Sequence, residues 1–257
     1  MRNLDAVLKE SVPYSVEGNI LHFILKEEDR PEWSRALDQH LVTNKVDLKM
    51  SEKYQRQKNE ALKDEKRRRF FDFILASDGA KVDLASGPSG YFSPILDGMG
   101  EKDIFIATDA CPSVVAAHSA ACDKDNFFVF DIDLDKELPF TDQSIAAFSG
   151  NYLDNVEHYG ELLKEIHRCL KPGGRFAVIE IFFEKGSRTY EHLNSQGAVW
   201  ASFETFTAFC ENLGFRCLGS DILLTRKGKI DEGDLYPLDE NDCSAERTVY
   251  FEKREAE

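Results

Sequence analysis

Three aspartates follow short apolar runs in the middle of the chain, at Asp83, Asp109 and Asp131. If these runs form neighbouring parallel strands, their carboxyl ends meet at one edge of the sheet, which is where open α/β sheets bind ligands. An aspartate at such an edge can accept hydrogen bonds from both hydroxyls of a ribose. Another that stands beside an apolar residue, as in Asp131-Ile132, suits the amino group and ring face of an adenine. The pattern indicates a nucleoside site.

A loop of small residues follows Asp83 and reads Leu-Ala-Ser-Gly-Pro-Ser-Gly over residues 84–90. Small residues let a ligand approach the backbone, and the start of the next helix offers free N–H groups. A carboxylate in front of the loop would repel the pyrophosphate of a dinucleotide, but it tolerates an ammonium or a sulfonium. The predicted ligand is therefore positively charged and free of phosphate.

Two other interpretations stay open. A single aspartate at a strand end is more often a helix cap or a turn former than a ligand-binding residue, although three in register reduce the weight of that interpretation. A nicotinamide oxidoreductase would share the fold, but the loop lacks the G-x-G-x-x-G pattern and begins with a carboxylate.

From Lys81 onward the chain alternates short apolar runs with helix-like stretches, which is typical of βαβ units. The predicted strands are residues 81–84, 104–108, 127–130, 145–149, 175–181, 217–224 and 248–252. The predicted helices are residues 90–98, 112–121, 159–170 and 203–213. The pattern predicts an α/β fold with a doubly wound, seven-stranded, mostly parallel sheet covered on both faces. A polar, acidic loop over residues 227–241 predicts that the last strand returns antiparallel as an edge hairpin.

The first 76 residues are polar, charged and helix-favouring. Apolar residues recur at helical spacing over residues 51–75, which predicts at least one long amphipathic helix. We therefore expect a helical cap or lid over residues 1–76, with Tyr54 and Gln57 reaching toward the ligand, and a ligand-binding domain over residues 77–257.

Several motifs in this order resemble those of the class I S-adenosylmethionine-dependent methyltransferases, in their small-molecule branch. The segments that carry the resemblance are VDLASGPSGYF (82–92), IFIATDACP (104–112), FDIDLDKELPFTDQSIAAFSG (130–150), HRCLKPGGRFAVIEI (167–181) and AFCENLGFRCLGS (208–220). Where the family usually has the first glycine of the loop, this chain has Ala85, and the last loop glycine is displaced to Gly90. A tighter loop of this kind would bind the cofactor less well, so a relative without activity is an open alternative.

The resemblance implies S-adenosylmethionine as cofactor, S-adenosylhomocysteine as product, and O- or N-methylation of a small-molecule acceptor. It assigns the methionine part of the cofactor to Asp83 and the loop, the ribose to Asp109 and Ala110, the adenine to Asp131 and Ile132, and the methyl-bearing side to Ser149. The loop residues concerned are Ala85, Ser86, Gly87, Ser89 and Gly90, and Tyr54 would join them from the lid.

His158 is the candidate catalytic base, because a histidine near its ordinary pKa could deprotonate a phenol or take a proton from an amine. The structural alternative is that it packs against or caps the helix that begins beside it. The alternative function is a non-catalytic relative that binds the cofactor and serves as a partner scaffold. We expect no metal, since no His, Cys and Asp cluster has ligand spacing.

The amino-acid composition argues against several classes of partner and favours one cellular location. The formal net charge of −15 disfavours nucleic acid and anionic lipid surfaces. The six scattered cysteines form no C-x-x-C pair, which favours free thiols in a reducing compartment. With no apolar run long enough for a membrane span and no secretory signal, we expect a cytoplasmic protein without a membrane partner. The oligomeric state stays open.

Overall fold

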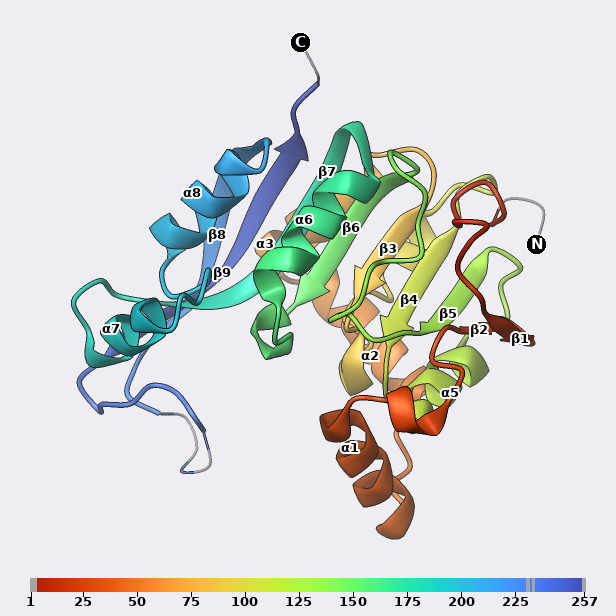
Figure 1. Ribbon diagram of the computed structural model, residues 1–257, viewed down its shortest axis with the longest axis horizontal. Coiled ribbons are helices and arrows are strands. Elements are labelled where there is room, and N and C mark those ends of the chain that lie inside the picture. The colour runs from red at the N-terminus through yellow and green to blue at the C-terminus, as the bar shows by residue number, and fades with distance from the viewer. Residues whose placement is uncertain (1–3, 230–231, 233, 256–257) are drawn as a thin grey trace.

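The computed structural model describes residues 4–229, 232 and 234–255, and it contains a nine-stranded sheet (Figure 1). The strand order across the sheet is β1-β2-β5-β4-β3-β6-β7-β9-β8. The strands are β1 (Ser15–Glu17), β2 (Ile20–His22), β3 (Lys81–Leu84), β4 (Phe105–Asp109), β5 (Phe127–Asp131), β6 (Ile145–Asn151), β7 (Leu170–Phe183), β8 (Phe215–Lys227) and β9 (Cys243–Lys253). The α-helices are α1 (Glu32–Thr43), α2 (Met50–Ala61), α3 (Glu65–Leu75), α4 (Ile95–Gly98), α5 (Pro112–Ala121), α6 (Tyr159–Cys169), α7 (Arg188–Ser195) and α8 (Phe203–Asn212). Short 3₁₀ helices are η1 (Glu27–Asp29), η2 (Gly87–Ser89) and η3 (Leu153–Asn155).

The predicted α/β class and the mostly parallel sheet are confirmed, and β3 to β9 correspond to the predicted strands. The N-terminal segment differs from the purely helical expectation, because β1 and β2 form a hairpin there. In the hairpin's second strand, Leu21 lies beside Phe130, so β2 extends the sheet parallel to β5. These two strands were not predicted because three residues are too few to show the alternation of apolar and polar residues that indicates a strand.

The last strand returns antiparallel in a hairpin at the edge of the sheet, as predicted. The final strand β9 runs antiparallel to both neighbours and lies between β7 and β8, so β8 is the edge. Val249 and Phe251 are buried on one face of β9 and Tyr250 on the other, as an interior strand requires, whereas Leu218 and Ile222 of β8 are exposed.

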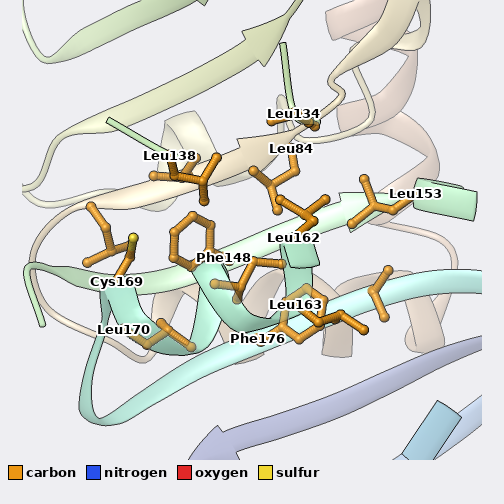
Figure 2. Packing of buried hydrophobic residues seen from close by; sticks show 14 of the residues in the cluster. Leu84, Leu134, Leu138, Phe148, Leu153, Leu162, Leu163, Cys169, Leu170 and Phe176 are labelled. Carbon is orange, nitrogen blue, oxygen red and sulfur yellow. The ribbon is translucent and has the colours of Figure 1, made fainter. Parts of the chain in front are cut away.

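Helices cover both faces of the sheet, and each face has its own hydrophobic core. Helices α6 and α8 cover the face turned to the viewer in Figure 1, and α3 lies behind the sheet. Strand β4 shows the alternation that separates the two cores, since Ile106 belongs to one and Phe105 and Ala107 belong to the other. Figure 2 shows Leu162 and Leu163 of α6 packed against Phe148 and Phe176 of the sheet.

The first part of β7, which directly follows α6 and is irregular in its pairing with β6, contains two glycines that it needs. Gly173 has a φ of +71°, and a Cβ atom on Gly174 would lie 2.7 Å from the carbonyl oxygen of Lys171. Beyond these glycines β7 runs parallel to β6, so the ends of both strands lie at the edge of the sheet where the candidate site lies. Across the part of the chain that the structure describes, every helix lacks the length and apolar character that crossing a bilayer requires.

Candidate functional site

A cavity of about 560 Å³ lies at the carboxyl ends of β3, β4, β5 and β6. We call it the cofactor cavity. Eight residues predicted from the sequence line it: Asp83, Ala85, Ser86, Gly87, Ser89, Asp109, Ala110 and Ile132. They come from three strand ends that are far apart in sequence and adjacent in the sheet. The expected meeting of strand ends at one edge therefore takes place.

Asp83 is a buried carboxylate that has no basic partner among the described residues. Its two oxygens accept hydrogen bonds from the hydroxyls of Ser149, at 2.6 Å, and Ser86, at 2.8 Å. Burial raises the pKa of Asp83 to about 7, against the opposing effect of both serine hydrogen bonds, and the nearby Asp109 raises it further. A cation bound in the cavity would favour the ionised form.

Asp109 is held by backbone donors. The N–H of Gly87 donates to one carboxylate oxygen at 2.9 Å, and the N–H of Cys111 donates to the other at 2.8 Å. Burial raises the pKa of Asp109 to about 6 in spite of these hydrogen bonds. Each oxygen keeps a second lone pair for a ligand hydroxyl.

The small-residue loop is tied to β4 and is strained at its first residue. The N–H groups of Ala85 and Ser86 donate to the hydroxyl and carbonyl oxygens of Thr108, at 3.2 and 2.7 Å. Ala85 has a φ of +47°, a left-handed conformation that costs a residue with a Cβ atom about 1–2 kcal/mol. The alanine that departs from the family pattern thus adopts the backbone that glycine favours.

Helix α2 supports this loop from behind. Lys53 donates to the carbonyl of Pro88 at 2.6 Å, and Gln57 donates to that of Ser89 at 3.3 Å. Tyr54 and Gln57 were expected to reach the ligand, but neither lines the cofactor cavity. Gly90 also lies outside the lining, and the ring of Tyr54 lies so close to it that a Cβ atom on Gly90 would be 2.7 Å from the ring.

His118 links Tyr54 to the loop, and the sequence analysis missed it. Its Nε2 lies 2.8 Å from the carbonyl oxygen of Gly87, and its Nδ1 lies 2.8 Å from the Tyr54 hydroxyl. Because a carbonyl can only accept, Nε2 carries the proton and Nδ1 accepts from Tyr54. Burial lowers the pKa of His118 to about 4, which keeps the ring neutral.

Asp131 does not line the cofactor cavity, which differs from its expected place against an adenine. Its carboxylate receives two hydrogen bonds from the Arg30 guanidinium, at 2.7 and 3.0 Å, and lies 3.0 Å from Nδ1 of His22. The cavity wall beyond β5 is formed by Ile132, Asp133 and Leu134 instead. Asp133, the first acid after this strand, could have been identified from the same sequence pattern.

Helix α1 closes one side of the cavity with Trp33 and Leu37, which the sequence analysis did not identify. Between them, Ser34 donates to the carbonyl of Ala110 at 2.5 Å. Asp38 accepts from the N–H and the hydroxyl of Ser113 at the start of α5, at 2.8 and 2.6 Å. These contacts join segments about 75 residues apart in the chain, which no local pattern predicts.

Two further predicted residues lie outside the lining. Ser149 is fully buried and reaches the cavity only through its hydrogen bond to Asp83. His158 is exposed at the rim, where its N–H and Nδ1 lie 2.7 and 3.2 Å from the Asp135 carboxylate. Three side chains near the rim, those of Asp135, Glu157 and His158, have atoms that could ligate a metal ion. These atoms lie within 4.8 Å of one another, but two of the three residues are exposed.

The wall beyond β6 is formed by Gly150, Asn151, Tyr152, Asn155 and Val156. Tyr91, Asn151 and Tyr152 also line a second hollow of about 730 Å³ beside α3, which we call the acceptor-side cavity. The side-chain oxygen of Asn151 is buried and accepts no hydrogen bond from the described protein. Behind this wall, buried Glu180 accepts from the N–H of Leu153 at 2.8 Å and so fixes the start of η3.

Comparison with known proteins agrees with this geometry. Residues 82–178 match a family model described as a methyltransferase domain. The match covers the strands and loops that build the cofactor cavity, from β3 into β7.

Curated relatives match over short stretches. The chain is 46% identical over 46 residues to the mouse (Mus musculus) mitochondrial 2-methoxy-6-polyprenyl-1,4-benzoquinol methylase, covering 18% of this chain and 14% of that protein. It is 30% identical over 103 residues to the ubiquinone/menaquinone biosynthesis C-methyltransferase of Bartonella henselae, covering 38% of this chain and 40% of that protein. The chain therefore spans less than half the length of both relatives.

Solved structures share the fold at low identity. The geranyl diphosphate C-methyltransferase of Streptomyces coelicolor has a TM-score of 0.54 and 13% identity, with 73% of this chain and 76% of that chain covered. The arsenic(III) S-adenosylmethionine methyltransferase of Chlamydomonas reinhardtii has a TM-score of 0.51 and 15% identity, with 69% and 64% covered. The prediction of a class I S-adenosylmethionine-dependent methyltransferase is confirmed at the level of domain family and fold.

Proposed function

We propose that the cofactor cavity binds S-adenosylmethionine and that the protein transfers its methyl group to a small-molecule acceptor. The observation that carries the proposal is the pair of buried carboxylates, Asp83 and Asp109, which line one cavity and have no basic partner in the described chain. Buried charges without a partner are costly, so a cationic ligand with hydroxyl groups suits them.

The residues present fit the parts of this cofactor. Asp83 and the loop would hold the methionine end with its ammonium group, and Asp109 would accept from the ribose hydroxyls. Ile132, Asp133 and Leu134 would face the adenine, with Trp33 and Leu37 of α1 on the other side. When bound, S-adenosylmethionine supplies a methyl group that its sulfonium already makes electrophilic.

The task of the chain is then to position a nucleophile and exclude water. Tyr91, Asn151 and Tyr152 stand between the cofactor cavity and the acceptor-side cavity, so we propose that the acceptor lies against them. The unpartnered oxygen of Asn151 suits an N–H or O–H donor, which supports O- or N-methylation. The Bartonella henselae relative is named a C-methyltransferase of ubiquinone/menaquinone biosynthesis, so a carbon acceptor is the outcome that would contradict this part.

His158 remains our proposed base, with Asp135 holding its ring at the rim of the cavity. A His158→Gln variant would lose most of the turnover and keep the affinity for S-adenosylhomocysteine. Unchanged turnover in this variant would leave His158 only its place at the start of α6.

The proposed role of residues 1–76 is a cap whose α1 closes the cofactor cavity. Replacing Trp33 and Leu37 by alanine should weaken the binding of S-adenosylhomocysteine, whereas the same change at the exposed Val42 of α1 should not. The six cysteines are unpaired in the structure, which supports the proposal of a reducing, cytoplasmic location.

The experiment that tests the function combines calorimetry with methyl transfer. We expect S-adenosylmethionine and S-adenosylhomocysteine to bind one to one, and labelled methyl groups to pass to members of a panel of small amines and phenols. Binding without transfer across the panel would favour the non-catalytic scaffold. Absence of binding would overturn the proposal.

A further inference from the structure

A third hollow lies at the end of the sheet where β7, β9 and β8 meet, beside the start of α8. It has a volume of about 940 Å³ and shares no lining residue with the cofactor cavity. We call it the basic cavity, after its cationic side chains from Lys185, Arg226, Lys227 and Arg247. Phe182, Phe183 and Phe203 supply aromatic wall.

The charge of this cavity opposes that of the whole protein. The chain carries a formal net charge of −15. The basic cavity nevertheless has four cationic residues and only two acidic ones, Glu184 and Glu204. Of these acids, Glu204 lies 3.9 Å from Lys185, at the far limit of an ion pair. An anion would therefore meet a locally favourable potential here.

Arg247 is the group at the centre of the inference. It is half-buried on β9, and its guanidinium carbon lies 4.8 Å from the centre of the Phe203 ring. Its Nε is buried without a hydrogen-bond partner, and within the described residues the side chain forms no ion pair.

The other buried or half-buried arginines of the described chain all donate to a protein oxygen. These are Arg30 to Asp131, Arg67 to Glu60, Arg168 to Glu165, Arg175 to the carbonyl of Phe73, and Arg226 to Glu246. A chain with 47 acidic residues thus pairs these five arginines and leaves Arg247 without a partner. A guanidinium stacked on an aromatic ring, with its donors free, is arranged for a planar anion such as a carboxylate.

We propose that the basic cavity binds an aromatic carboxylate, with the carboxylate on Arg247 and the aromatic body against the phenylalanines. The unpaired donors supply recognition of charge, and Phe182, Phe183 and Phe203 supply apolar contact. Lys227, which has no ion pair within the described segments, adds a second positive charge at the rim. The site does not depend on the function proposed for the cofactor cavity.

Calorimetry with 2-naphthoate, and with 2-naphthamide as its uncharged counterpart, tests the proposal. We expect the wild-type protein to bind 2-naphthoate one to one and at least tenfold more tightly than 2-naphthamide. Arg247→Gln should weaken 2-naphthoate at least tenfold, Arg254→Gln at the exposed end of the chain should not, and Asp109→Ala should leave this affinity unchanged. Equal affinity in Arg247→Gln, or loss of binding in Asp109→Ala, would overturn the proposal.

A second measurement needs no variant. Cys243 is exposed and lines the basic cavity. Bound 2-naphthoate should slow the labelling of this thiol by an alkylating reagent, as followed by mass spectrometry of the peptide, and should leave the labelling of Cys122 unchanged. Cys122 is a partly exposed thiol outside the cavity. An unchanged rate at Cys243 would count against occupancy of the cavity.

Discussion

The cofactor cavity and the basic cavity hold unpaired charges of opposite sign. In the first, Asp83 and Asp109 are bonded only by hydroxyls and backbone N–H groups, and in the second, Arg247 stacks on Phe203 without an acidic partner in the described chain. Elsewhere, buried charges such as Asp131 and Arg30 are paired with each other. A buried charge that is paired within the chain therefore holds the fold, whereas one that lines a cavity without a partner of opposite charge indicates a ligand.

Asp109 and Asp131 allow an unpaired and a paired buried charge to be compared at matching positions, because they lie opposite each other on β4 and β5. Both are buried aspartates at strand ends. One lines the cavity and the other anchors the N-terminal segment through Arg30. Position in the sheet therefore does not decide the role of an aspartate, but the presence of a partner does.

The largest expected effect concerns the paired charge. Arg30→Gln leaves the Asp131 carboxylate buried without its partner, which typically costs about 3–5 kcal/mol. We expect the free energy of unfolding, measured in urea, to fall by that amount. Arg35→Gln, at an exposed arginine five residues further on, is the control. A loss no greater than that of the control would break the comparison.

The second-largest effect is expected at Asp109, which has no partner of opposite charge in the described chain. In the proposed complex Asp109 accepts two charge-assisted hydrogen bonds from the ribose, so we expect Asp109→Ala to lower the affinity for S-adenosylhomocysteine about a hundredfold or more. Calorimetry measures the affinity, and circular dichroism checks the fold. Asp125→Ala, at an exposed aspartate outside the cavity, should bind as the wild type does. Similar affinities in the two variants would show that Asp109 does not contribute to binding.

Asp83 should lower the stability of the ligand-free protein at neutral pH. Its folded-state pKa of about 7 lies above the ordinary value of 3.8, so its contribution to stability is full below the ordinary value and is lost as the pH rises through 7. Asp83→Asn does not titrate. Between pH 4 and 7 the melting temperature of the wild type should therefore fall relative to that of the variant. The fall should be about 2–4 °C for each kcal/mol of unfolding free energy that the wild type loses, and the difference should stay constant above pH 7. A difference that stays constant with pH would contradict the raised pKa.

The smallest effect is expected at Ala85. Glycine there relieves the left-handed strain but increases the freedom of the unfolded chain, so the net gain in unfolding free energy is at most about 1 kcal/mol. Ala116→Gly, at an exposed position inside α5, should instead lose about 1 kcal/mol. If Ala85→Gly destabilised the protein as much as this control does, the loop would not be strained.

Local patterns predicted the central strands and the position of Asp83 and Asp109 at one edge of the sheet. Asp83 and Asp109 could be found because their place depends on the strand before them and the loop after them. The ion pair of Asp131 with Arg30 could not be predicted, because the two residues lie 101 positions apart in the chain. The same limit applies to Trp33 and Leu37, which reach the cavity only after α1 docks on α5, and to the three-residue strand β2.

The most direct test of the central claim is the affinity for S-adenosylmethionine at pH 7.5 and pH 5.5, in the wild type and in Asp83→Asn. Because the pKa of Asp83 is raised to about 7 and that of Asp109 to about 6, protonation at pH 5.5 removes the negative charge that a cationic cofactor needs. We predict binding at least about tenfold weaker at pH 5.5 in the wild type, and a much smaller change in the variant, where only Asp109 still titrates. The same affinity at both pH values in the wild type, or the same change in both proteins, would contradict the account.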